Sequence, residues 1–148
     1  MTNPKRYIFV LWSDGFDEVV TAMFVTQLRE AGLLVRVVGL LPGQISGARG
    51  LALVPDLRLD QALALAAQVQ CLIIPSISRW SERFNSDPRL NQLVEQLNAN
   101  QAIYVMGQTD PSITLQAKKP RFNQATTLIY PQMPDTFHFA RQLARQLS

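Results

Sequence analysis

Few residues of this sequence carry side chains that can do chemistry, and an acidic group of them follows the first apolar run. Asp14, Asp17 and Glu18 come directly after Tyr7–Trp12. Open α/β sheets bind ligands beyond the carboxyl ends of their strands, so one interpretation of the cluster is a ligand or catalytic site containing Asp14 and Glu18. The alternative is capping of the following helix, whose N-terminus favours carboxylates.

Two nucleophile candidates lie in or just after a second apolar run, at 70–75. Cys71 stands inside that run, which favours a buried structural thiol over a reactive one. Ser76 follows the run, but a hydroxyl nucleophile needs a neighbouring base, and the one histidine, His138, is far away in the sequence. One cysteine and one histidine supply neither a disulfide nor a multi-ligand metal site. We therefore predict no metal and no cofactor.

A polar segment after the 70–75 run combines aromatic and basic residues. It contains Arg79, Trp80, Arg83 and Phe84. Tryptophan and arginine are enriched among the residues that dominate binding energy at protein interfaces. One interpretation is therefore a surface for a protein partner, and the other is that Trp80 and Phe84 cover the end of the sheet.

Length and composition limit the class of protein. The chain has 148 residues, of which 47% are hydrophobic and 17% charged, which predicts one globular domain over 1–148 and excludes a disordered chain. A net charge of +3 with scattered basic residues does not indicate nucleic-acid binding. No apolar run approaches the ~20 residues of a membrane span, and the first is too short for a signal peptide. We expect a cytoplasmic protein without membrane insertion.

The elements that position these residues alternate between two kinds. The first strand, helix and second strand fit within about 35 residues, a unit that gives parallel strands. Repetition of the pattern predicts a doubly wound three-layer α/β sandwich with a mostly parallel sheet of five to six strands. Asp135 is expected to cap the last helix. Strands are predicted at 7–12, 33–40, 70–75, 102–106 and 126–130, helices at 17–31, 59–67, 88–98 and 135–147, and a hairpin pairing 44–46 with 51–53.

The order of several short strings resembles the ThiJ/PfpI superfamily, whose fold is flavodoxin-like or class I glutamine-amidotransferase-like. The resemblance implies that fold over nearly the whole chain, and a homodimer formed through the first helix and neighbouring strands. The strings are Gly15-Phe16-Asp17-Glu18, the segments 28–33 and 35–40, Val54-Pro55-Asp56 with Leu59-Asp60, and Asp135 to Ala140.

The chemistry that the resemblance implies is missing from the matching positions. Enzymes of the superfamily use a cysteine nucleophile at a strand-to-helix elbow, where this sequence has Met106 followed by Gly107. A glutamate of the first helix hydrogen-bonds that cysteine, and Val20 stands at the matching position. The glycine pair after the third strand is replaced by Ser76 and Ile77, and no histidine occurs between Met106 and residue 126. A thioether has no ionisable proton and cannot attack a carbonyl.

These losses predict a degenerate pocket and a non-catalytic domain that acts as a binding or assembly module. In that pocket, Val20 and Met106 are expected to pack against each other, because two apolar replacements can fill the space together. The module is expected to be homodimeric or docked on a larger complex. The alternative is a hydrolase-like or glyoxalase-like enzyme of the superfamily with a relocated site, in which Asp14, Glu18 and Ser76 are the residues to test.

Overall fold

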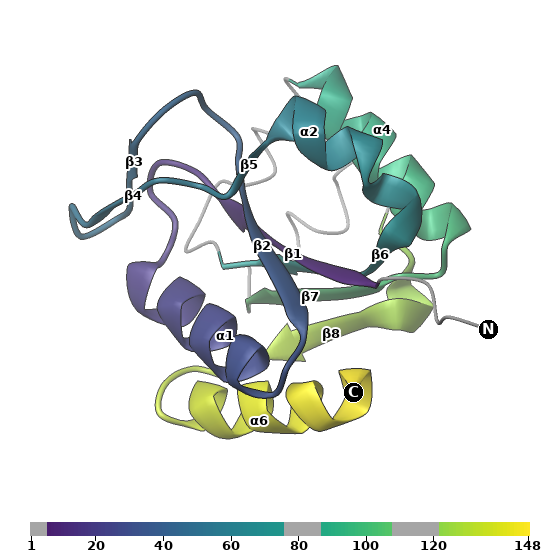
Figure 1. Ribbon diagram of the computed structural model, residues 1–148. Helices are drawn as coiled ribbons and strands as arrows, with labels where there is room; N and C mark the ends of the chain where they lie inside the picture. Colours follow the sequence, from purple (N-terminus) through teal and green to yellow (C-terminus); the bar gives the residue numbers. More distant parts are fainter. Residues whose placement is uncertain (1–5, 76–86, 108–121) are drawn as a thin grey trace.

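The computed structural model describes residues 6–75, 87–107 and 122–148, which form three layers (Figure 1). The middle layer is a six-stranded sheet in the order β5-β2-β1-β6-β7-β8, and each of its strand pairs is parallel. Its strands are β1 (Tyr7–Trp12), β2 (Leu34–Gly39), β5 (Leu57–Arg58), β6 (Val69–Ile74), β7 (Ile103–Gly107) and β8 (Thr127–Tyr130). The predicted doubly wound α/β sandwich is therefore confirmed.

Helices cover both faces of the sheet (Figure 1). On one face lie α1 (Glu18–Glu30) and α6 (Asp135–Leu147), and on the other lie α2 (Leu59–Ala64) and α4 (Pro88–Ala99). Short 3₁₀ helices, η1 (Ala66–Gln68) and η2 (Gln124–Thr126), precede β6 and β8. In the described part of the chain, no helix is long and apolar enough to cross a membrane.

Strand alternation divides the buried side chains into two cores. Along β7, Tyr104 and Met106 join the core under α2 and α4, whereas Val105 joins the core under α1 and α6. In β1, Ile8 and Val10 face α1 and α6, whereas Phe9 and Leu11 face α2 and α4. The central strands therefore need apolar residues at nearly every position, which is why they appear as continuous apolar runs.

Most element boundaries lie within one residue of those predicted, but the helix predicted at 59–67 ends at Ala64 and a separate 3₁₀ helix follows it; the strand β5 and the cap of α6 also differ. The hairpin forms as predicted, pairing β3 (Ile45–Ser46) antiparallel with β4 (Ala52–Leu53). The short strand β5 had no recognisable sequence signal and pairs with only two residues of β2. The prediction that Asp135 caps α6 is wrong: the cap position is Pro134, no side chain caps it, and Asp135 is the first helical residue, where its charge suits the helix N-terminus.

Candidate functional site

The candidate site lies at the carboxyl edge of the sheet, where the strand order reverses. From β1 the chain places β2 on one side and β6 on the other, so β1 and β6 flank a topological switch point. The start of α1 is held there by a hydrogen bond of 2.8 Å from the Asp17 N–H to the carbonyl of Pro75, which follows β6. The acidic cluster therefore lies beyond the carboxyl end of β1, as the sequence predicts.

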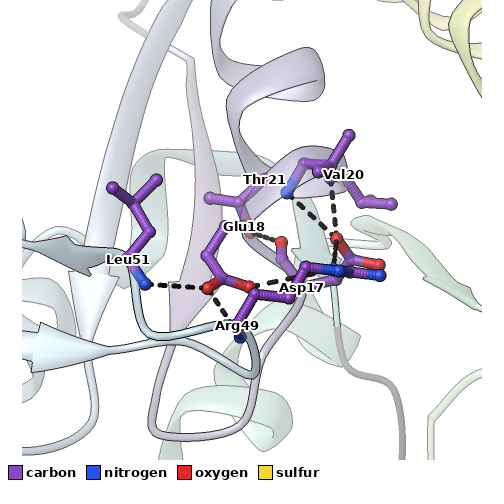
Figure 2. Close-up of polar contacts among 7 residues, drawn as sticks. Asp17, Glu18, Val20, Thr21, Arg49 and Leu51 are labelled. Atoms are coloured by element: carbon purple, nitrogen blue, oxygen red, sulfur yellow. Dashed lines mark hydrogen bonds and ion pairs between the residues drawn. The ribbon is translucent and has the colours of Figure 1, made fainter.

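Asp17 caps α1 and orders its first turn. Its Oδ1 accepts hydrogen bonds from the N–H groups of Val19 and Val20 at 3.0 and 3.1 Å. The same oxygen lies 3.1 Å from Nη1 of Arg49, which comes from the β3–β4 hairpin (Figure 2). The carboxylate therefore joins the helix start to the hairpin turn, in addition to its capping role.

Glu18 ties the hairpin to the helix more strongly, because its side chain is buried. The residue is 3% exposed, and Oε2 accepts hydrogen bonds from the N–H groups of Arg49 at 2.7 Å and Leu51 at 3.0 Å (Figure 2). Oε1 lies 3.8 Å from Arg49 Nη1 and has no hydrogen-bond partner among the described residues. Burial alone would raise the pKa of this carboxyl. The N–H groups of Leu51, Glu18 and Arg49, with the Arg49 charge, outweigh burial and hold its pKa below the ordinary value.

Gly47 and Trp12 close the space around Glu18. A Cβ placed on Gly47 would lie 2.5 Å from Cδ of Glu18 and 2.6 Å from Cη2 of Trp12, so only glycine allows this approach. Trp12 is fully buried, and its indole Nε1 donates to the carbonyl of Ile45 at 3.0 Å. Glu18 is thus enclosed between α1 and the hairpin, and its Oε2 holds the hairpin backbone.

The expected contact between Val20 and Met106 is wrong. Val20 belongs to the core under α1 and α6, whereas Met106 belongs to the core under α2 and α4. The reason is the two-residue period of β7, which directs the Met106 side chain to the opposite face of the sheet.

The position on β7 that faces α1 is instead Gly107, and Tyr130 of β8 fills the space beside it. A Cβ on Gly107 would lie 2.7 Å from Oη of Tyr130. The Tyr130 ring packs edge-on against Phe24 of α1, with centroids 5.5 Å apart. Burial, with the negative charge of Asp17, raises the pKa of the Tyr130 phenol.

The other sequence candidates are not brought into this arrangement. Asp14 is exposed at the edge of the sheet and accepts a hydrogen bond from the Ser13 hydroxyl at 2.9 Å. Cys71 is fully buried, and burial raises the pKa of its thiol. His138 is exposed on α6. The predicted site and interface residues Ser76, Ile77, Arg79, Trp80, Arg83 and Phe84 lie outside the described residues.

Sequence reasoning missed three residues that shape the site. From the sequence, Gly47 and Arg49 belong to the connection of the predicted hairpin, and Tyr130 is the last residue of the strand predicted at 126–130. The usable signal was positional: Tyr130 ends a strand at the same sheet edge as the acidic cluster. Within the described ranges, no group of three or more His, Cys, Asp or Glu residues could hold a metal ion.

Comparison with known proteins supports the fold over nearly the whole chain. A family model described as DJ-1/PfpI matches residues 6–137. A mutant DJ-1 superfamily protein from Salmonella typhimurium aligns with a TM-score of 0.79 at 15% identity, covering 96% of this chain and 90% of that chain. DJ-1beta from Drosophila melanogaster aligns with a TM-score of 0.79 at 15% identity, covering 97% and 90%.

A two-domain protein from Anabaena variabilis is also similar. Its structure contains a DJ-1/ThiJ/PfpI-like domain and a ferritin-like domain, and it aligns with a TM-score of 0.75 at 14% identity, covering 97% of this chain and 48% of that chain. At these identities the structures show a common fold only. No curated protein matches the sequence.

Proposed function

The chain belongs to the DJ-1/PfpI family, and from this premise we propose that it is a non-catalytic member that acts as a binding or assembly module. The observation that carries the proposal is the filled space beside Gly107, where a side chain would meet the hydroxyl of Tyr130 at 2.7 Å. Glycine offers no nucleophile, and the neighbouring Met106 directs a thioether into the opposite core. Two successive positions at the end of β7 therefore lack a group that could attack a substrate.

The acidic residues nearby support the same proposal. A catalytic carboxylate needs an oxygen within hydrogen-bond reach of the proton that it exchanges with a substrate, and Glu18 is only 3% exposed. Glu18 is enclosed by the hairpin and accepts two backbone N–H groups, while Asp17 accepts two more and pairs with Arg49. In this arrangement both carboxylates stabilise the folded chain.

The rival proposal is a hydrolase-like or glyoxalase-like enzyme with a relocated site. It would use Asp14, Glu18 and Ser76. Two observations favour it: Asp14 is exposed, and Oε1 of Glu18 has no hydrogen-bond partner among the described residues. A glutamate whose pKa is held low is a weak proton donor near neutral pH, which argues against Glu18 as a general acid.

The test is turnover of methylglyoxal and of p-nitrophenyl acetate by the purified protein and by Met106→Cys. We expect neither protein to exceed the rate with bovine serum albumin. Met106→Cys would add a thiol to the core under α4, where a lowered pKa and a positioned base are lacking. Turnover by the unchanged protein that Asp14→Asn or Glu18→Gln abolishes would instead support the relocated enzyme.

The binding role itself is tested by light scattering. We expect a dimer, or a stable complex with a partner, at micromolar concentration. A strict monomer that retains no partner under native purification would contradict the assembly role, whatever the outcome of the turnover assay.

A further inference from the structure

A groove between α1 and α6 is lined by side chains whose exposure and charge are not accounted for by contacts within the fold. It has a volume of about 420 Å³ and is lined by the C-terminal half of α1 and one flank of α6, including Gln27, Glu30, Phe137, Arg141 and Arg145. Phe137 is 43% exposed although it is a large apolar side chain. The groove thus presents a partly exposed aromatic ring beside two guanidinium groups.

The two arginines differ from most others in the described part of the chain. The Arg141 guanidinium lies 5.8 Å from the ring centroid of Phe137. Neither Arg141 nor Arg145 forms a hydrogen bond or an ion pair there. By contrast, four arginines elsewhere each contact a carboxylate within 4 Å: Arg29, Arg49, Arg58 and Arg89.

The spacing on α6 suits an extended peptide. Phe137, Arg141 and Arg145 stand four residues apart, which separates neighbours by about 6 Å along the helix axis. Alternate side chains of an extended chain lie about 7 Å apart and point the same way. An apolar residue followed by two acidic residues at alternate positions therefore matches the ring and the two guanidinium groups in register.

We propose that this groove binds an extended acidic segment of a partner protein. Its carboxylates pair with Arg141 and Arg145, and its apolar side chain packs on Phe137. Planar guanidinium groups bind carboxylates in a two-bond geometry, so two arginines in register give both affinity and selectivity. Glu30 on the opposite side repels a carboxylate, which limits the acidic positions to the α6 flank. The inference gives a partner class to the binding role proposed above and rests on it.

The test is fluorescence anisotropy with a labelled heptapeptide, acetylated and amidated at its ends, at low ionic strength. The peptide has leucine at its first position, glutamate at its third and fifth, and serine elsewhere. One control replaces the glutamates with glutamine, and a second places the two glutamates next to each other. We expect binding of the first peptide, no measurable binding of the glutamine peptide, and weaker binding of the adjacent-glutamate peptide.

Variants of the protein test the location. We expect Arg141→Gln and Arg145→Gln each to weaken binding about threefold and together about tenfold, by analogy with partly exposed ion pairs. Removal of the repulsion in Glu30→Gln should tighten binding about twofold. The matched control is Arg89→Gln on α4, which removes the same charge on the opposite face and should leave binding unchanged.

Four outcomes would overturn the inference. The first two are absence of binding at millimolar peptide and equal binding of the glutamine peptide. The third is an Arg89→Gln effect as large as that of Arg145→Gln, since this would indicate unspecific charge attraction. The fourth is a dimer in light scattering that the double variant Arg141→Gln/Arg145→Gln dissociates, since a second copy of the chain would then occupy the groove. Methylglyoxal turnover would contradict the proposed function but would leave the peptide measurements unchanged, so the two proposals fail separately.

Discussion

The two ends of helix α1 use charge in opposite ways. At the N-terminal end, Asp17 and Glu18 accept four backbone N–H groups between them and contact Arg49. At the C-terminal end, the helix faces Arg141 and Arg145, which contact no carboxylate in the described part of the chain. Charge at the first end holds the fold together, whereas charge at the second end remains available to a ligand.

The hairpin accounts for this difference. The β3–β4 segment folds back over the N-terminal end of α1 and supplies both donors to Glu18, as Figure 2 shows. No described segment covers the groove beside the C-terminal end, where Phe137 remains exposed. The comparison therefore predicts that substitutions at the first end change stability, and that substitutions at the second end change binding alone.

The largest effect is expected from Trp12→Ala. The indole is fully buried, belongs to the core under α2 and α4 and donates to Ile45, so its loss removes a large packed surface and a hydrogen bond. We expect the free energy of unfolding to fall by about 3–5 kcal/mol in urea titrations. The control is Leu51→Ala on the same hairpin, which is 55% exposed and should change stability little. A small Trp12→Ala effect would show that the hairpin end is not what stabilises this region.

A smaller loss is expected from Gly47→Ala. The added methyl group would lie within 2.6 Å of both Glu18 and Trp12, so the hairpin must move away from α1. Overpacking of this kind costs about 1–3 kcal/mol. Ser46→Ala, at an exposed position next to it, is the control. In a double-mutant cycle, Glu18→Ala should reduce the cost of Gly47→Ala, and strict additivity would contradict the contact.

Glu18→Gln should change the pH dependence of stability more than stability at neutral pH, because glutamine keeps an oxygen that can accept from the hairpin. The folded-state pKa of Glu18 is lowered. Its contribution is therefore fully present above the unfolded pKa of about 4.3, and it is lost as the pH falls through the lower folded-state value.

Thermal unfolding between pH 7 and pH 3 measures this contribution. The unchanged protein should lose more stability on acidification than Glu18→Gln does. Asp60→Asn is the control, because the pKa of Asp60 is also lowered, by a hydrogen bond from Arg58, but its side chain is 59% exposed. Parallel curves for Glu18→Gln and the unchanged protein would show that the carboxylate charge is not required at this end of the helix.

Most of the fold could be predicted from the sequence. The central strands are buried on both faces, so each forms a continuous apolar run that can be identified without knowing which strand it pairs with. The boundaries of β1 were predicted as observed, and Asp87 caps α4 as its position before Pro88 indicates. The strand β5 could not be predicted, since two residues form no period and owe their conformation to pairing with β2.

The site was predicted less completely, because its geometry depends on contacts between distant segments. The resemblance predicts that Val20 and Met106 stand where the superfamily has reactive residues, but only the strand register shows that they face opposite cores. Likewise, nothing local to Glu18 reveals that its carboxylate binds N–H groups more than thirty residues away. The alternative that assigned the acidic cluster to the helix N-terminus holds for Asp17, which caps α1, and for Glu18, which lies in its first turn.

The smallest stability effect is expected at the groove. Arg141→Gln and Arg145→Gln remove charges that form no ion pair in the described part of the chain, and glutamine is a good helix former on an exposed face. We expect each variant to unfold within about 0.5 kcal/mol of the unchanged protein. The matched variant Arg49→Gln removes the contact with Asp17 and should cost about 0.2–1 kcal/mol, as exposed ion pairs do. Urea titrations at low and high salt separate an ion-paired arginine from an unpaired one. Salt screens the Arg49–Asp17 contact, so the stability difference between the unchanged protein and Arg49→Gln should shrink at high salt, whereas the difference for Arg141→Gln should stay the same. A clear loss of stability in Arg145→Gln would mean that these arginines have a folding role, and the contrast between the two ends of α1 would then disappear.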